Sequence, residues 1–164
     1  MTGCYARTAP DDRDALPEVD HWIGGADPEA LPELLASLAG AGEPPGEEPS
    51  AAVVDRLLGH TRTFLKIQDG CDAVCAYCIV PKARGPSRSV PLRVAVESAR
   101  RAERDGAREI VLTGIHAGRY GVDRGEADGL AALIEELLSA TSRCRCRLGS
   151  VEPQEITPRL VGIL

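Results

Sequence analysis

The chain has few large aromatic side chains: its 164 residues include one Phe, one Trp and three Tyr, and a single Met. A hydrophobic core must therefore be built mainly from Leu, Val, Ile and Ala. No stretch approaches the roughly 20 apolar residues that a membrane-spanning helix requires. No apolar segment has the features of a secretory signal either. These absences predict a cytoplasmic protein with no membrane association.

Histidine is also scarce, at three residues, whereas there are six cysteines. In a reducing compartment, cysteines bind metals more often than they form disulfides. Cys71, Cys75 and Cys78 have the spacing C-x3-C-x2-C. A zinc site would need further Cys or His at ligand spacing, but the nearest downstream histidine is His116. A disulfide framework is disfavoured too, because only two of the three could pair and the local geometry would be strained.

Three thiolates in one short loop predict an iron–sulfur cluster instead. Thiolates are the ligands that such clusters prefer. Three of them can hold three irons of a [4Fe–4S] cluster, which leaves the fourth iron open to a small molecule. An open coordination position is typical of a catalytic metal site and not of a structural one.

The charge is unevenly distributed along the chain. The formal net charge is −6, which alone argues against a nucleic-acid partner. Residues 9–55 contain one Arg and twelve acids, whereas residues 56–108 contain eleven Lys or Arg and five acids. This asymmetry favours a basic working face beside an acidic region, and the alternative is a solvated surface without a special role. Lys82, Arg84 and Arg88 are candidate phosphate contacts.

Pro and Gly are concentrated in residues 40–50, which predicts a linker and a domain boundary. We therefore divide the chain into residues 1–40, a linker over 41–60 and a second domain over 61–164. A helix is expected at Pro32–Ala39. In the second domain, strands are expected at Thr61–Gln68, Glu109–Thr113 and Arg145–Val151, with helices within Pro91–Gly106, after Asp128 and from Thr157.

Alternating strands and helices predict an α/β fold with a parallel sheet and right-handed crossovers. In such sheets, ligands bind beyond the carboxyl ends of the strands. The cysteine loop, the segment Gly114–Gly121 and the segment Ser150–Glu152 each follow one of the three strands. The three segments are therefore expected to meet at one rim of the sheet.

Longer segments carry a resemblance to a known family. They are Lys66–Gly70 and Ile79–Ser89 around the cysteines, and Val111–Gly121 and Leu148–Pro153 further along. They resemble the radical S-adenosylmethionine core of the tRNA methylthiotransferases, in particular the threonylcarbamoyladenosine branch. Thr2–Ala6 resembles the end of a cysteine pattern in the N-terminal domain of that family.

The resemblance implies a fold. It is α/β, with a partial (β/α) radical-SAM barrel of parallel strands preceded by a remnant of an α/β N-terminal methylthiotransferase domain. Residues 1–40 would be the C-terminal part of that N-terminal domain, and residues 61–164 the N-terminal half of the radical SAM core. The chain is accordingly expected to be a fragment that is not competent for the full reaction.

The resemblance also implies site residues, although none of them is assigned a catalytic role. Cys71, Cys75 and Cys78 would hold the [4Fe–4S] cluster that S-adenosylmethionine chelates. Cys4 would be one ligand of a second [4Fe–4S] cluster, and its other two ligands have no counterpart in this chain. The implied cofactor contacts are Tyr77, Thr113, Gly114, Ile115, Gly118, Ser150 and Glu152.

The implied activity adds a methylthio group to carbon 2 of N6-threonylcarbamoyladenosine, next to the anticodon. The implied partners are a tRNA anticodon stem-loop and a reductant such as flavodoxin or ferredoxin, and the protein is expected to be a monomer. One alternative is a sister methylthiotransferase acting on isopentenyladenosine in tRNA or on a ribosomal protein. The other is a non-catalytic remnant that binds a cluster.

Three further expectations concern residues outside the motif. His116 is expected to be a surface or turn histidine rather than a ligand. Cys144 and Cys146 alternate along one predicted strand, so both should face the same side and be buried as small hydrophobic residues. The interleaved Arg143, Arg145 and Arg147 should be solvated on the opposite face.

Overall fold

The computed structural model describes residues 1–24, 30–39, 53–54, 62–149 and 151–164. The chain forms two compact units, one of Met1–Glu48 with Asp72–Gly85 and the other of Pro49–Cys71 with Pro86–Leu164. Except for Val53–Val54, the predicted linker at 41–60 lies outside the described residues.

The second unit contains a mixed sheet built on three parallel strands. These are β2 (Arg62–Asp69), β4 (Glu109–Gly114) and β5 (Arg145–Leu148), with β4 in the middle. Two short strands, β1 (Val53–Val54) and β3 (Arg88–Ser89), pair antiparallel with β2. The predicted α/β fold and parallel strands are confirmed for this unit, and β5 ends three residues earlier than expected.

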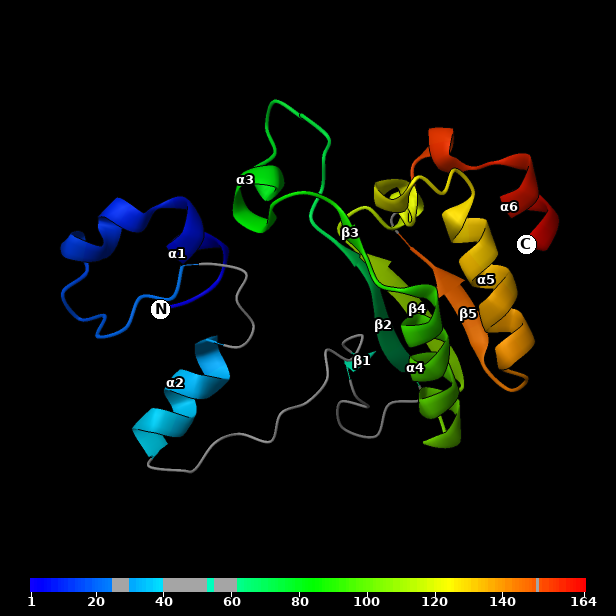
Figure 1. The fold of residues 1–164 in the computed structure, drawn as a ribbon, viewed down its shortest axis with the longest axis horizontal. Helices are drawn as coiled ribbons and strands as arrows, with labels where there is room; N and C mark the ends of the chain where they lie inside the picture. The colour runs from blue at the N-terminus through cyan, green and yellow to red at the C-terminus, as the bar shows by residue number, and fades with distance from the viewer. Residues whose placement is uncertain (25–29, 40–52, 55–61, 150) are drawn as a thin grey trace. The chain divides into compact units, whose positions relative to one another are not determined.

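Two helices cover one face of this sheet, α4 (Leu92–Arg104) and α5 (Gly129–Ala140), and they lie side by side in Figure 1. Small residues form the buried face of α4, at Ala95, Ala99 and Ala102. A buried leucine and isoleucine stripe does the same in α5. Both helices pack on alternate residues of β2 and β4, namely Leu65, Ile67, Ile110 and Leu112. This is the aliphatic core that the scarcity of aromatic residues predicted.

Helix α6 (Pro158–Ile163) packs against α5, and Leu160 contributes to the core. The hydroxyl of Thr157 accepts a hydrogen bond from the Leu160 amide, which caps the helix at its first turn. Three short 3-10 turns, η3 (Ala117–Arg119), η4 (Val122–Arg124) and η5 (Pro153–Glu155), complete the unit. All three lie toward the carboxyl ends of the parallel strands (Figure 1).

The other face of the sheet carries charged side chains near the amino ends of the strands. Glu109 of β4 forms ion pairs with Arg62 of β2 at 3.4 Å and with Arg147 of β5 at 2.7 Å. The expectation that Arg147 is solvated on this face is confirmed, since its side chain is 56% exposed, and the structure adds its ion pair with a carboxylate on the neighbouring strand.

The regular alternation of β2 breaks near its carboxyl end. The register with β4 shifts between Lys66 and Gln68, which marks a bulge. Ile67 and Gln68 are consequently both fully buried, although neighbouring strand residues normally face opposite sides.

In the first unit, the described elements are helical. They are α1 (Cys4–Thr8), the 3-10 turn η1 (Pro10–Ala15), α2 (Ala30–Ala39) and α3 (Val80–Arg84). α2 confirms the helix expected before the linker. Trp22 holds the N-terminal segment together, because its ring N–H donates to the Ala6 carbonyl at 2.8 Å and its ring lies beside that of Tyr5. None of the helices among the described residues is both long and apolar enough to cross a membrane.

Candidate functional site

The segments that follow β2, β4 and β5 meet in the second unit. Cys71 follows β2, His116 follows β4, and Glu155 lies on η5 after β5. The Cys71 sulfur lies 3.5 Å from Nδ1 of His116, and Nε2 of His116 lies 2.5 Å from Oε1 of Glu155. A thiol, an imidazole and a carboxylate are thus in a row. Two of them belong to predicted segments, whereas Glu155 lies three residues beyond the third, Ser150–Glu152.

Burial sets this row apart from surface contacts. The Cys71 residue is 9% exposed, and the side chains of His116 and Glu155 are 13% and 9% exposed. His116 lies in the bend between β4 and η3, so the expectation of a surface or turn histidine is confirmed as to the turn, although its side chain is largely covered. Glu155 is held from its other oxygen, because Oε2 accepts a hydrogen bond from the Glu152 amide at 3.0 Å. No sequence motif contains Glu155, so its role was not predicted.

The position of Glu155 beside His116 leaves no room for a side chain at Gly118. A Cβ atom at this position would lie 1.7 Å from Oε2 of Glu155 and 2.5 Å from its carboxyl carbon. Gly114 has a comparable relation to Gln68, whose Oε1, Cβ and backbone O would lie 3.0 to 3.1 Å from an added Cβ. Both glycines therefore have a packing role within this chain, whatever contacts they make with a cofactor.

Gln68 is a residue that the sequence motifs did not single out. It is fully buried, and its side-chain amide contacts the backbone of Gly70 and His116 and the hydroxyl of Ser87. A glutamine in a strand gives no sequence signal for such a role.

The first unit contains the rest of the cysteine motif. Ala76 and Tyr77 form a turn, after which the Cys78 amide donates to the Cys75 carbonyl at 3.0 Å. Cys75 is exposed, Cys78 is partly exposed, and Tyr77 and Val74 are 92% and 98% exposed. The side chain of Tyr77 is thus available to a ligand and does not pack within the loop.

None of the six cysteines, all of which lie among the described residues, forms a disulfide. Among the described residues, no group of three or more Cys, His, Asp or Glu side chains is arranged to hold a metal ion. The donor chemistry nevertheless fits a [4Fe–4S] cluster, because Cys71, Cys75 and Cys78 supply three thiols in one short segment, none of them in a disulfide. Cys4 is exposed at the start of α1.

The other predicted contacts are placed as follows. Thr113 and Gly114 are partly buried at the end of β4, and Ile115 is 36% exposed. Glu152 is exposed and begins the turn η5. Ser150 lies outside the described residues. Lys82 and Arg88 are exposed, whereas Arg84 is partly buried.

Cys144 and Cys146 pack against the core, as expected, although both are only partly buried. The Cys144 thiol donates to the Ala107 carbonyl at 3.1 Å. Burial raises the pKa of both thiols, which keeps them in the neutral form.

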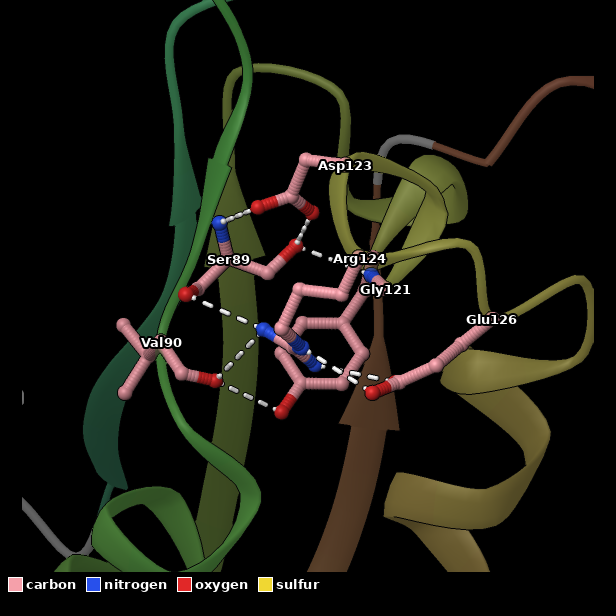
Figure 2. A network of polar contacts seen from close by, with 7 residues as sticks. Ser89, Val90, Gly121, Asp123, Arg124 and Glu126 are labelled. Carbon is pink, nitrogen blue, oxygen red and sulfur yellow. Dashed lines mark hydrogen bonds and ion pairs between the residues drawn. The ribbon is translucent and has the colours of Figure 1, made fainter.

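A polar network holds the loop after β4 against β3 (Figure 2). The Ser89 amide donates to Asp123 at 2.9 Å, and the Ser89 hydroxyl contacts both Asp123 and the Gly121 amide. Arg124 pairs with Glu126 at 3.0 Å and donates to the Ser89 carbonyl at 3.1 Å. The guanidinium also lies 4.9 Å from the centre of the Tyr120 ring.

The charges of this network stabilise one another. The hydrogen bond and charge of Arg124 lower the pKa of Glu126, and the Glu126 carboxylate in turn raises the pKa of Arg124. Burial alone would raise the pKa of Asp123, but the hydrogen bonds from the Ser89 hydroxyl and amide hold it below its usual value. Burial raises the pKa of Tyr120. Each group thus keeps its ordinary charge at neutral pH.

No family model matches the chain. Individual proteins do. The chain is 33% identical over 98% of its length to threonylcarbamoyladenosine tRNA methylthiotransferase MtaB of Thermotoga maritima, and 35% identical over its whole length to MtaB of Bacillus subtilis. It is also 38% identical over 91% of its length to ribosomal protein uS12 methylthiotransferase RimO of Nitratidesulfovibrio vulgaris.

The chain spans between 34% and 38% of the length of these relatives. The relatives share the methylthiotransferase name but differ in the molecule that their names give as substrate. By its similarity to them over nearly its whole length, the chain belongs to the methylthiotransferase family.

Proposed function

We propose that this chain provides the cluster-binding part of a radical S-adenosylmethionine enzyme. The enzyme would transfer a methylthio group to N6-threonylcarbamoyladenosine in tRNA. One observation carries the proposal: three cysteines with the spacing C-x3-C-x2-C begin two residues after the end of β2, at the carboxyl ends of the parallel strands, and none of them forms a disulfide. Two of the relatives named above are tRNA methylthiotransferases that match nearly the whole chain.

Cys71, Cys75 and Cys78 would hold a [4Fe–4S] cluster. When bound, this cluster would supply the electron that cleaves S-adenosylmethionine. The chain would contribute a buried first ligand, Cys71, next to His116, and an exposed segment with the other two ligands. Burial around Cys71 limits water at one side of the site, which is a means of tuning a cluster.

We assign the cofactor contacts on the same basis. Tyr77, whose side chain is exposed, would contact S-adenosylmethionine, and further contacts would come from the carboxyl ends of β4 and β5, where parallel sheets commonly bind ligands. The proposed contacts at those two ends are Thr113, Gly114, Ile115, Gly118, Ser150 and Glu152. Cys4 would be a ligand of a second cluster.

The proposed partners are a tRNA anticodon stem-loop and a flavodoxin- or ferredoxin-like reductant, with a cytoplasmic monomer as the working form. Lys82, Arg84 and Arg88 would contact phosphates, since basic side chains supply affinity without reading sequence. A second candidate, methylthiolation of a ribosomal protein, is favoured by one observation, the 38% identity to RimO.

Anaerobic reconstitution with iron and sulfide, followed by incubation with S-adenosylmethionine and dithionite, tests the cluster chemistry. We expect bound iron and the formation of 5′-deoxyadenosine and methionine, and neither from Cys75→Ala. A wild-type chain that binds no iron would contradict the proposal. Binding of an anticodon stem-loop, compared with binding of protein uS12 under the same conditions, distinguishes the tRNA substrate from the ribosomal one.

A further inference from the structure

Gln68 is the last buried side chain of β2 before the cysteine motif. Its pairing partner across the sheet is Gly114 of β4. The bulge between Lys66 and Gln68 places the Gln68 side chain inside the unit, where it is 0% exposed. A buried amide needs hydrogen-bond partners for both its oxygen and its nitrogen.

Both ends of the Gln68 amide have such partners. Nε2 donates to the Gly70 carbonyl at 2.6 Å, and it contacts the Ser87 hydroxyl at 2.9 Å and the Asp69 carbonyl at 3.0 Å. Oε1 accepts from the His116 amide at 2.9 Å. Reversing the amide would place oxygen against carbonyl oxygens and nitrogen against an N–H, so these partners allow one orientation only.

The partners of Gln68 come from separate parts of the chain. Gly70 directly precedes Cys71, and Ser87 follows the segment that contains Cys75 and Cys78. We call residues 71–86 the cysteine loop, so that Gly70 and Ser87 are its two flanking residues. His116 belongs to the loop after β4 and contacts Cys71 through its side chain. One buried amide therefore joins both ends of the cysteine loop to the backbone of the histidine beside its first cysteine.

The local backbone supports this arrangement. Gly70 has φ of 71°, a left-handed conformation that favours glycine, and its amide donates to Oδ1 of Asp69 at 2.8 Å. Gly114 leaves room for the Gln68 side chain, because an added Cβ would lie 3.0 Å from Oε1. The bulge, the turn at Gly70 and the lack of a side chain at Gly114 thus all allow the Gln68 side-chain amide to occupy this position.

We propose that Gln68 is a positioning residue that holds the two ends of the cysteine loop together and sets Cys71 against His116. The part of this inference that concerns metal binding rests on the proposed function, since it takes Cys71 as a cluster ligand. Without Gln68, the ends of the loop separate more readily, and a thiolate that is not held in place binds metal less tightly. Groups that orient metal ligands typically change metal affinity by about 10- to 100-fold when they are removed.

Two variants of Gln68 separate its two contacts. Gln68→Glu keeps an oxygen that accepts from the His116 amide and can accept from the Ser87 hydroxyl, but it removes the donor to the Gly70 carbonyl. Gln68→Leu removes both. Ser87→Ala removes a single partner and is the mildest change. Gln154→Leu, at an exposed position on η5, is the matched control for losing a glutamine.

Hydrogen exchange of the metal-free chain, measured by mass spectrometry, reports how well the backbone amides at the ends of the cysteine loop are protected. In Gln68→Leu we expect faster exchange in peptides around residues 69–71, 86–89 and 115–117. In Gln68→Glu the peptides around residues 69–71 should exchange faster, because the Gly70 carbonyl has lost its donor, while the His116 amide stays protected. Exchange in α5 should remain as in the wild type. The proposal is overturned if Gln68→Glu, Gln68→Leu and Ser87→Ala all exchange at the wild-type rate. It is also overturned if exchange in α5 becomes faster by as much as exchange at the ends of the cysteine loop.

Iron retention tests the consequence for the metal site. After reconstitution, we expect both Gln68 variants to lose iron to a chelator about 10-fold faster than the wild type and Gln154→Leu. Equal rates in all four proteins would overturn the role toward the cluster. If the wild type itself binds no iron, the proposed function fails, whereas the exchange experiment still decides whether Gln68 closes the loop.

Discussion

The Glu155 carboxylate lies 2.5 Å from Nε2 of His116 and approaches it over a glycine. Oε2 of Glu155 occupies the space that any side chain at Gly118 would need. The carboxylate can reach the histidine only because position 118 has no Cβ. This contact therefore links two residues of the segment Val111–Gly121, His116 and Gly118, to a glutamate that lies outside every segment carrying the family resemblance.

Replacing Gly118 by Ala should displace Glu155 from His116. Introducing an atom into a filled site typically costs about 1–3 kcal/mol, and we expect a loss of unfolding free energy in this range. The measurement is urea denaturation followed by circular dichroism. In a Glu155→Ala background the same substitution should cost less than about 0.5 kcal/mol, because the clash is gone. Equal costs in both backgrounds would show that the carboxylate is not what excludes the methyl group.

The cysteine motif makes a prediction that depends on ligand number. Cys71→Ala, Cys75→Ala and Cys78→Ala should each abolish the visible absorbance and the iron content of the reconstituted chain, since a cluster of this type needs all its thiolates. Cys146→Ala, which removes a partly buried thiol in β5, should leave both unchanged. Full iron content in Cys75→Ala would rule out the proposed ligand set.

Tyr120 is 1% exposed and donates from its hydroxyl to the Val90 carbonyl at 2.7 Å. Tyr120→Phe removes this hydrogen bond but keeps the ring beneath the Arg124 guanidinium. We expect a loss of about 1 kcal/mol in unfolding free energy, the usual value of one buried hydrogen bond. Tyr5→Phe is the control, because the Tyr5 hydroxyl bonds to Asp12 at an exposed site. A loss as large in the control would mean that burial of the bond does not matter.

The lowered pKa of Asp123 predicts that the free energy of unfolding depends on pH in the acid range. Its pKa is lowered in the folded state, although burial opposes this, by hydrogen bonds from Ser89. A lowered carboxyl pKa stabilises the fold above the unfolded value of about 3.9 and ceases to do so as pH falls through the folded value. Asp123→Asn should therefore be less stable than the wild type at pH 7, and the difference should shrink on acidification to pH ~3.

The urea midpoint at both pH values measures this effect, with Asp11→Asn as an exposed control. A difference between Asp123→Asn and the wild type that stays constant with pH would contradict the assignment. Arg124 and Glu126 lie in the same network, so the Glu126 carboxylate also loses its pairing on acidification. The comparison with Asp123→Asn isolates the share that belongs to Asp123.

Hydrophobic periodicity was enough to predict the regular part of the fold. β2, β4, α4 and α5 lie within one or two residues of their expected bounds, because each has a buried face that the pattern of apolar residues marks. Asp128 precedes α5 as expected, but its side chain makes no capping hydrogen bond. The position of the helix is thus set by the packing of its leucines and not by its cap.

The residues that the sequence did not reveal depend on register and on turns. Simple alternation places Gln68 on the same exposed face as Lys66, and only the bulge between them buries it. Glu155 and Asp123 lie on short 3-10 turns, where no periodicity exists to mark them. His116 follows a strand end that looks like an ordinary turn in sequence. Its burial arises from partners in segments far away along the chain.

The paired charges on the open face of the sheet have a consequence for how this protein can change over evolution. Glu109 joins β2 and β5 through β4 near the amino ends of the strands, whereas every proposed ligand contact in this unit lies toward their carboxyl ends. Ion pairs thus connect the strands at one end, and the proposed ligand contacts lie at the other. Substitutions at the carboxyl-end rim can therefore accumulate without disturbing these ion pairs. This separation offers a physical route by which one sheet is kept among relatives whose names give different substrates, a tRNA in one case and ribosomal protein uS12 in the other.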